Sequence, residues 1–335
     1  TNAGKMAQYV TKNSAPRSVY ESLLTDTFKK TEISNLFKGS GSYTETEYNA
    51  FDTLIVDEAH RLNEKSGIFS NKGENQIKEI IHSSKVSVFF IDDAQRIHIK
   101  DIGSSGEIRK WAEKFDADFQ EVELTSQFRC AGSDGYLAWI DNILGIRETA
   151  NFDLSEIYYD FRVFDSPSEL RDEIFEKNRT NNKSRLVAGY CWDWVSKKNS
   201  SLKDISIPGS DFFMQWNLGD DGMLWMIKEK SVHQVGCIHT CQGLELDYIG
   251  VVIGPDLRIE DGKLITEPRA RAKTDHSIKG WKKQMKTAPE GTFKKLDEII
   301  RNTYRTLMTR GMKGCYVYAV DKELNEYLKA SINGT

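Results

Sequence analysis

The sequence predicts an α/β protein of two domains, each with a mainly parallel sheet flanked by helices. Two apolar, β-branched runs at residues 54–56 and 86–91 are typical of strands buried on both faces of a sheet. A predicted helix over 75–83 separates them, and a strand–helix–strand unit gives two parallel strands joined by a right-handed crossover. The 335 residues are enough for two domains with separate cores.

Composition describes an ordinary globular protein, with 39% hydrophobic and 29% charged residues. No apolar run approaches the roughly 20 residues of a membrane span, and the N-terminus does not resemble a signal peptide. The five cysteines are scattered and odd in number, which favours reduced thiols and a cytoplasmic location. The net charge of −4 gives no global sign of nucleic-acid binding, so such binding would have to be local.

The first domain is expected to span residues 1–147. A short strand through Tyr9 and Val10 ends at Thr11, and a helix follows from Pro16, in its first turn, through Lys29. The other elements expected here are a loop at 36–48, the acidic strand near 51–58, a loop at 64–74, the helix and strand named above, a helix at 106–115, a strand at 120–124, a helix ending near Gly145 and a linker at 146–153.

The second domain is expected to span residues 148–335. Its first helix has Ser166 as N-cap with Glu169 three residues later, the pattern of a capping box. The other expected elements are strands at 160–164, 184–190, 235–239, 247–253 and 314–319, an irregular stretch at 196–221, a hairpin at 260–263 and a helix at 296–309.

The most informative stretch reads FDTLIVDEAHRL and covers residues 51–62. A buried parallel strand that ends in Asp57 and Glu58 places both acids at the carboxyl end of the sheet, where α/β proteins bind ligands. An Asp–Glu pair at this point is the Walker B arrangement of nucleotide hydrolases. Asp57 would hold the Mg²⁺ of Mg-ATP through water, and Glu58 would orient or deprotonate the attacking water. The alternative is a strand that ends in a polar turn.

Four further strings follow along the chain: Asp92 to Gln95, Gln127-Phe128-Arg129, His239-Thr240-Cys241-Gln242-Gly243-Leu244-Glu245, and Leu307-Met308-Thr309-Arg310. Together with the acidic strand, this set resembles superfamily 1 helicase-type motors, which have two RecA-like domains. It also resembles a bacterial family of domains of unknown function, akin to the helicase-like part of Schlafen proteins. The resemblance covers the chain from Tyr9 to Tyr318.

The resemblance implies roles around the nucleotide. Asp92 with Gln95 would sense the γ-phosphate, although the family's glycine before the Asp is Ile91 here. Arg129 would reach the γ-phosphate at the domain boundary, and Arg310 would act as an arginine finger from the second domain. Without the resemblance, Asp92 would be a solvated strand end, and Arg129 and Arg310 would be ordinary surface charges.

The string at 239–245 would couple nucleic acid to the nucleotide. Thr240 would bind a phosphate of the strand, Gly243 would allow close backbone approach, and Gln242 and Glu245 would face the nucleotide cleft. The alternative is a loop that caps a strand. Thr11 is a candidate to touch the phosphate backbone, or to belong to a turn that caps the next helix.

The glycine-rich loop G-x-x-x-x-G-K-[ST], which cradles the phosphates in such motors, does not occur in this sequence. The chain begins with Thr1 rather than Met, so we expect the first strand and phosphate loop of domain one upstream of Thr1. We therefore expect this chain to bind ATP poorly by itself, and the parent protein to hydrolyse it.

A basic segment at 258–295 carries eleven Lys or Arg against five acids, a net charge of +6. Lys279, Trp281, Lys282 and Lys283 lie inside it, and lysines beside an aromatic ring suit a phosphate backbone with one stacked base. The alternative is a solvated insertion.

The predicted function is an ATP- and Mg²⁺-dependent helicase or translocase motor on single-stranded DNA or RNA, with its cleft near residue 150 and other domains upstream. One alternative is a nucleotide-gated switch or scaffold that hydrolyses ATP without unwinding. A second is a metal-dependent nuclease using Asp57, Glu58, Asp92 and Asp93, against which the arginines in finger positions argue.

Overall fold

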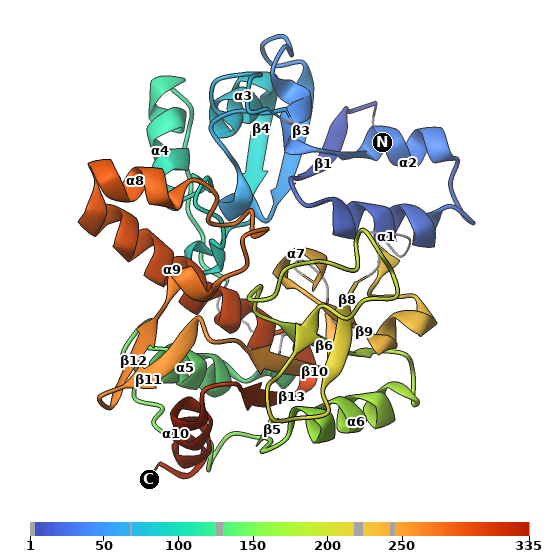
Figure 1. The fold of residues 1–335 in the computed structure, drawn as a ribbon. Coiled ribbons are helices and arrows are strands. Elements are labelled where there is room, and N and C mark those ends of the chain that lie inside the picture. Colours follow the sequence, from blue (N-terminus) through green and yellow to red (C-terminus); the bar gives the residue numbers. More distant parts are fainter. Residues whose placement is uncertain (1–3, 68, 125–129, 218–223, 242–244, 335) are drawn as a thin grey trace. The chain divides into compact units, whose positions relative to one another are not determined.

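A computed structural model describes residues 4–67, 69–124, 130–217, 224–241 and 245–334 (Figure 1). The chain divides into unit 1, Thr1–Glu123, and unit 2, Leu124–Thr335. Each unit has a sheet of mainly parallel strands flanked by helices, which confirms the predicted α/β fold class. Among the described residues, no helix is long and apolar enough to cross a membrane.

The sheet of unit 1 is entirely parallel, in the order β2-β1-β3-β4. Its strands are β1 (Ala7–Thr11), β2 (Phe37–Lys38), β3 (Phe51–Asp57) and β4 (Ser84–Phe89). Thr11 pairs with Asp57, and Val56 pairs with Phe89. These strands therefore end at one edge of the sheet, as parallel pairing requires.

Helical residues pack on both faces of this sheet: Tyr20 contacts Tyr9 on one face, with ring centres 6.1 Å apart, and apolar residues cover Leu54 and Val56 on the other. The helices of unit 1 are α1 (Ser14–Leu24), α2 (Lys30–Leu36), α3 (Gln76–Ser83) and α4 (Ser105–Lys114). Ile77 and Ile80 of α3 and Ile108 of α4 form one core with Leu54 and Val56. Short 3-10 helices follow β3 at Ala59–Arg61 and β4 at Asp93–Gln95.

Four predictions for unit 1 are wrong. The stretch 36–48, predicted as a loop, contains β2 and a 3-10 helix at Ser40–Tyr43. The strand predicted at 86–91 as buried on both faces is β4, which leaves Val86 and Val88 exposed. The helix predicted through Lys29 ends at Leu24, and a second helix, α2, begins at Lys30. The strand predicted at 120–124 does not form, and Val122 within it is 81% exposed. An alternating apolar pattern becomes a strand only when another strand supplies hydrogen-bond partners.

The main sheet of unit 2 has the order β5-β13-β10-β6-β9-β8-β7 among the described residues. Neighbours are parallel, except for the antiparallel pair of β7 and β8. The strands are β5 (Asp160–Val163), β6 (Ser184–Ala188), β7 (Ile205–Ser206), β8 (Phe213–Trp216), β9 (Gln234–Gly236), β10 (Leu246–Ile253) and β13 (Gly311–Ala319).

Helices pack on both faces of this sheet. A Cβ at Gly250 would lie 2.6 Å from Ile174 of α6, and one at Gly189 would lie 2.0 Å from the hydroxyl of Tyr304 of α9. Gly250 and Gly189 point to opposite faces, since Val252 pairs with Ala188. The helices are α5 (Asp134–Ile143), α6 (Pro167–Asn178), α7 (Ile238–Cys241), α8 (Trp281–Thr287), α9 (Pro289–Met308) and α10 (Lys322–Asn333).

Several elements of unit 2 differ from the sequence prediction. The stretch predicted as irregular contains β7 and β8, and His239 lies in α7 rather than at the end of a strand. Helix α9 begins earlier than predicted, and α10 was not predicted. Helix α5, expected to close the first domain, contacts the end of unit 2: Trp139 Nε1 donates to the Ser331 carbonyl at 3.1 Å. The division between units therefore falls at 123/124 rather than at 147/148.

The basic segment begins with the predicted hairpin, formed by β11 (Leu257–Glu260) and β12 (Lys263–Thr266). Asp261 and Gly262 both have positive φ, as a tight two-residue turn requires. Beyond the hairpin, Arg271 is buried, with its Nε 2.7 Å from Asp275 Oδ2 and 3.7 Å from Asp256 Oδ2. This buried ion pair attaches the segment to the end of β10.

Candidate functional site

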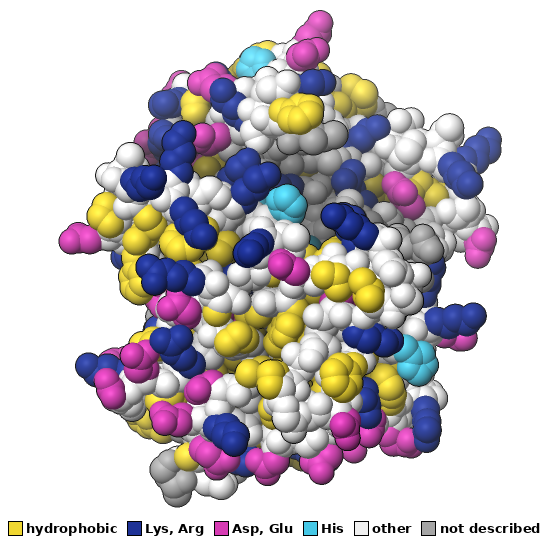
Figure 2. All heavy atoms as spheres, viewed as in Figure 1, with side chains coloured by type: hydrophobic (Ala, Val, Ile, Leu, Met, Phe, Trp, Pro, Cys, Tyr) yellow, Lys and Arg dark blue, Asp and Glu magenta, His cyan; other side chains and the backbone are white. Residues whose placement is uncertain are grey.

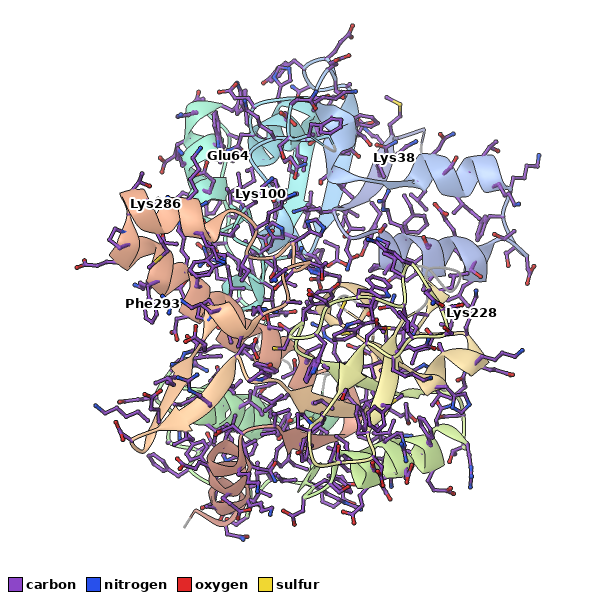
Figure 3. All side chains as sticks on the ribbon, viewed as in Figure 1. Lys38, Glu64, Lys100, Lys228, Lys286 and Phe293 are labelled. Atoms are coloured by element: carbon purple, nitrogen blue, oxygen red, sulfur yellow. The ribbon has the colours of Figure 1, made fainter. Side chains whose placement is uncertain are left out.

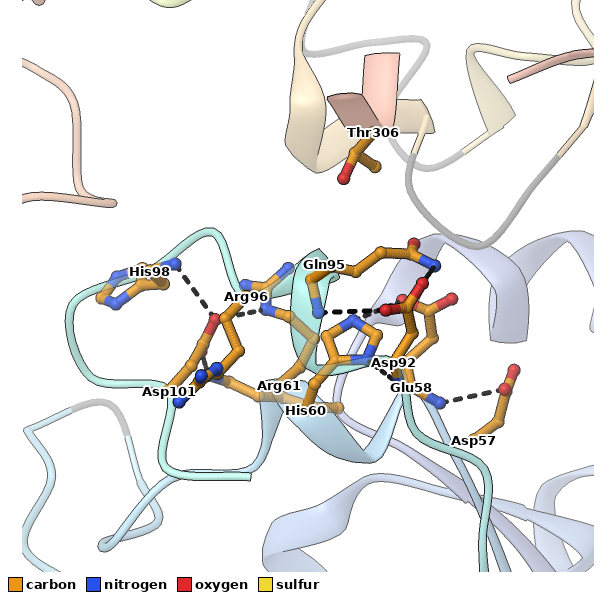
Figure 4. A network of polar contacts seen from close by, with 12 residues as sticks. Asp57, Glu58, His60, Arg61, Asp92, Gln95, Arg96, His98, Asp101 and Thr306 are labelled. Carbon is orange, nitrogen blue, oxygen red and sulfur yellow. Dashed lines mark hydrogen bonds and ion pairs between the residues drawn. The ribbon is translucent and has the colours of Figure 1, made fainter. Parts of the chain in front are cut away.

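The acids predicted in unit 1 come together at the carboxyl edge of its sheet (Figure 4). Asp57 ends β3 and Glu58 follows it, while Asp92 and Gln95 lie in the turn just beyond β4. Thr11 ends β1 beside Asp57. Its Oγ1 is buried and makes no hydrogen bond with any described residue. Parallel pairing therefore assembles residues from three separate stretches of sequence.

Asp57 is half-buried and held from two sides. The backbone N–H of Glu58 donates to Asp57 Oδ1 at 2.9 Å, and the hydroxyl of Tyr9 donates to Oδ2. Burial, and then the hydrogen bond to Asp57, raises the pKa of Tyr9 well above its usual value. The phenol therefore remains a proton donor to this carboxylate at any physiological pH.

Glu58 adopts an uncommon backbone conformation. Its φ of 53° lies in the left-handed region, which costs a residue with a Cβ on the order of 1 kcal/mol or more. Its side chain is only 6% exposed. A buried carboxylate in a strained turn persists only where the surrounding groups hold it, and such residues are concentrated at functional sites.

His60 contacts both strand ends. Its Nε2 lies 3.1 Å from Glu58 Oε2, and its Nδ1 accepts a hydrogen bond from the backbone N–H of Asp92 at 3.4 Å. Asp92 in turn accepts from Gln95 Nε2 at 2.8 Å and from the backbone N–H of Ala94 at 3.0 Å. The two acids and the amide predicted to surround the nucleotide are thus joined through one buried histidine.

A second polar network lies at the same edge. Lys12 Nζ lies 2.7 Å from Asn63 Oδ1 and 3.4 Å from Asp101 Oδ1, while Arg61 Nε lies 3.0 Å from Asp101 Oδ2. Burial lowers the pKa of Lys12 to about 8, against the attraction of Asp101. This network ties the ends of β1 and β3 to the loop before α4.

Sequence reasoning missed Tyr9, His60 and Lys12 as parts of this site. The signal for Tyr9 is its position two residues before Thr11, which puts both side chains on one face of β1. His60 is part of the acidic string, but its spacing cannot show that it contacts the turn after β4. That contact depends on the pairing of β3 with β4.

In unit 2, the structure brings the neighbourhoods of Glu245 and Arg310 together. The backbone N–H of Leu246 donates to the carbonyl of Arg310 at 3.0 Å, where β10 and β13 begin. Glu245 is exposed, whereas the side chain of Arg310 is buried and its Nε donates to the Thr306 carbonyl at 3.2 Å. Arg305, one turn earlier, pairs with Asp141 of α5 at 2.5 Å.

Thr240 lies in α7, where its hydroxyl closes a local ring. It accepts from the backbone N–H of Cys237 at 2.9 Å and lies 2.8 Å from the Cys237 carbonyl. A phosphate would therefore compete with this capping interaction. The predicted site residues Arg129, Gln242 and Gly243 lie outside the described residues.

The predicted nucleic-acid residues of the basic segment lie on and just before α8. Lys279, Lys282 and Lys283 are exposed, while Trp281 is half-buried with Lys282 Nζ 5.7 Å from its ring centre. Dark-blue Lys and Arg side chains lie over α8 in Figure 2. Figure 3 marks Lys286 of α8 and Phe293 of α9, which is 53% exposed. This surface combines positive charge with aromatic rings, as strand-binding surfaces do.

Comparison with known proteins gives a family and distant relatives. The family model described as "Schlafen group 3, DNA/RNA helicase domain" matches residues 1–321. An uncharacterized protein of Saccharomyces cerevisiae, YPL245W, is 27% identical over 299 residues, which cover 83% of this chain and 64% of that protein. The matched region thus spans less than two thirds of the length of this relative.

Among solved structures, S. cerevisiae Dbp5 bound to RNA and ADP BeF3 covers 100% of this chain and 76% of that chain, with 9% identity and a TM-score of 0.32. A point variant of Dbp5 with the same ligands covers 99% of this chain and 75% of that chain, with 11% identity and a TM-score of 0.33. These likenesses are too distant to indicate a ligand or an activity for this chain.

Proposed function

Because the chain belongs to the family of Schlafen group 3 DNA/RNA helicase domains, we propose that it forms most of an ATP-driven motor on single-stranded DNA or RNA. The observation that carries this proposal is the assembly of Asp57, Glu58, Asp92 and Gln95 at the carboxyl edge of a parallel sheet. The sequence resemblance implies that this chain is bacterial, and that origin remains a prediction.

The residues present fit a magnesium nucleotide by their chemistry. Mg²⁺ prefers oxygen ligands and retains most of its waters. Among the described residues, each oxygen of Asp57 accepts a hydrogen bond, from Tyr9 or from the Glu58 N–H, and a carboxylate oxygen has a second lone pair for a metal-bound water. When bound, the ion would neutralise charge on the phosphates.

Three protein groups would then perform the hydrolysis. Glu58 would accept the proton of the attacking water. The amide of Gln95 would contact the γ-phosphate and change its hydrogen-bond partner when the phosphate leaves. Arg310 would stabilise the transition-state charge, which requires its side chain to exchange the Thr306 carbonyl for a phosphate oxygen. Arg129 and Gln242 would complete the nucleotide contacts.

The nucleic acid would lie against a different set of residues. Lys279, Lys282 and Lys283 would contact phosphates, and Trp281 would stack on a base. Thr11, Thr240 and Gly243 would contact the nucleic-acid strand near the nucleotide. Gln242 and Glu245 would lie between the nucleic acid and the nucleotide.

An open edge of the unit 1 sheet supports a missing strand and phosphate loop. Among the described strands β4 is at the edge. Val86 and Val88 on one of its faces are 53% and 39% exposed, and Phe90 just after it is 47% exposed. Val122, in the stretch predicted as a strand, is also exposed. The apolar side chains of a parallel strand are normally covered by another element of the protein, whereas those of β4 are exposed. We propose that chain outside residues 1–335 supplies a strand, the phosphate loop and a helix here.

The test is ATP hydrolysis by a longer polypeptide that includes a glycine-rich phosphate loop, with and without single-stranded DNA or RNA. Stimulation by nucleic acid is expected, and Glu58→Gln should lower kcat by about 100-fold or more. Arg310→Ala should abolish the stimulated rate. A rate of ATP hydrolysis that is the same with and without nucleic acid would favour a nucleotide-gated switch. The absence of hydrolysis by such a polypeptide would refute the proposal.

A further inference from the structure

His60 is a deeply buried titratable side chain at the edge of the unit 1 sheet, and the proposed mechanism does not use it. It is 2% exposed and lies in the short 3-10 helix after β3. Its two ring nitrogens face two different loops: Nε2 is 3.1 Å from Glu58 Oε2, and Nδ1 is 3.4 Å from the backbone nitrogen of Asp92 (Figure 4).

These contacts determine which nitrogen carries the proton in the neutral ring. A backbone N–H can only donate, so Nδ1 must present its lone pair to Asp92. The proton of a neutral imidazole is then on Nε2, which faces the carboxylate of Glu58. A histidine whose second nitrogen is engaged in this way has a defined tautomer and ring orientation.

Glu58 needs such a partner. Its left-handed backbone is held by the hydrogen bond from its own N–H to Asp57, but this bond leaves the direction of the side chain open. A carboxylate that is 6% exposed requires polar neighbours, and the Nε2 atom of His60 lies 3.1 Å from Glu58 Oε2. This contact gives one oxygen of Glu58 a buried neighbour that is itself held by the turn after β4.

The same ring reaches the loop of the proposed γ-phosphate sensor. The backbone of Asp92 donates to His60, and the carboxylate of Asp92 accepts from Gln95 Nε2 at 2.8 Å. The contacts thus run from Glu58 through His60 and Asp92 to Gln95. A shift of Gln95 when the phosphate leaves would be transmitted to the carboxylate by this short path.

We propose that His60 is a positioning residue, which orients Glu58 through Nε2 and couples it to the Asp92–Gln95 turn through Nδ1. This role rests on the proposed function of Glu58 as the base of ATP hydrolysis. A histidine that only fills the core would tolerate any replacement of similar size and would have no preferred tautomer.

The first experiment uses residues 1–335 without any nucleotide. Histidine labelled with ¹⁵N is observed by NMR, and His60 is assigned from the signal lost in His60→Gln. The expected result is a neutral ring protonated at Nε2 and unprotonated at Nδ1. A ring protonated at Nδ1 would overturn the proposal whatever the enzyme does.

The second experiment compares two replacements in a longer polypeptide that carries the phosphate loop. The amide oxygen of His60→Asn lies near the position of Nδ1 and accepts from Asp92, but its side chain is too short for Glu58. The amide nitrogen of His60→Gln lies near the position of Nε2 and donates to Glu58. We expect His60→Asn to lower kcat by about 10- to 100-fold with KM for ATP unchanged, and His60→Gln to retain the larger part of kcat.

Thermal unfolding of both variants separates positioning from packing. Equal losses of kcat that follow equal losses of stability would show that His60 only fills space, and full activity in His60→Asn would also overturn the proposal. If the wild type hydrolyses no ATP, the proposed function fails and this role fails with it. That outcome differs from an active wild type whose kcat is unchanged when His60 is replaced, which would refute only the role of His60.

Discussion

Gly103 offers a sharp test of how the loop after Glu58 is packed. A Cβ at this position would lie 1.9 Å from the carbonyl oxygen of Ala59 and 2.6 Å from the Cα of His60. Gly103 does not need a positive φ, so the obstacle to Gly103→Ala is space alone. The substitution therefore presses directly on the segment that orients the proposed catalytic base.

The size of the effect follows from these distances. Real Cβ atoms essentially never come within 3.0 Å of another heavy atom, so the two backbones must separate by roughly 1 Å. Overpacking of this kind costs about 1–3 kcal/mol, and both obstacles are backbone atoms that cannot rotate away. We expect a loss near the upper end, about 3 kcal/mol, in the free energy of unfolding of unit 1.

The assay is urea denaturation read by hydrogen exchange and mass spectrometry, which reports the peptides of unit 1 and unit 2 separately. Gly106→Ala on α4 is the matched control, because the nearest atom to its Cβ would be Ser104 Oγ at 4.0 Å. The control should be neutral or stabilising by up to about 1 kcal/mol. Equal unfolding midpoints for Gly103→Ala and the wild type would refute the packing described here.

Three further predictions concern charge. Arg271→Met leaves two buried aspartates without their cation, and denaturation should show a loss of about 3–5 kcal/mol confined to unit 2. Lys12, with its pKa lowered to about 8 from 10.5, loses its proton on folding between these values. The unfolded chain then binds more protons, so the free energy of unfolding should rise from pH 8 to pH 10 relative to Lys12→Met. The double variant Lys282→Glu, Lys283→Glu should weaken strand binding and flatten its salt dependence in a filter assay, whereas Lys230→Glu should change neither.

Some features of this protein follow from local sequence alone. The run at 54–56 is apolar because β3 is a central parallel strand whose Leu54 and Val56 are buried, and the acids Asp57 and Glu58 come where this strand ends. The hairpin is equally local, since Asp261 and Gly262 supply the positive φ values of its turn. Asp57 and Asp92 lie at one edge of the sheet because the parallel strands β3 and β4 end together.

Other features depend on partners that sequence spacing does not specify. Residues 120–124 have the alternation of a strand but remain outside the sheet, because backbone hydrogen bonds must come from a neighbour. Helix α5 belongs to unit 2, where the Tyr136 hydroxyl donates to the carbonyl of Met308 and Trp139 Nε1 donates to that of Ser331. Periodicity predicts that a segment has an apolar face, but it does not say which core that face joins.

The site shows the same division at atomic scale. Residue types alone were enough to predict that Asp57, Glu58, Asp92 and Gln95 follow neighbouring strands, because buried strands are apolar and their ends are polar. The place of His60 between them, with one nitrogen toward each loop, could be known only from the folded chain. Hydrogen bonds act over about 3 Å, and distances of that size are determined only when the strands pair and the side chains pack.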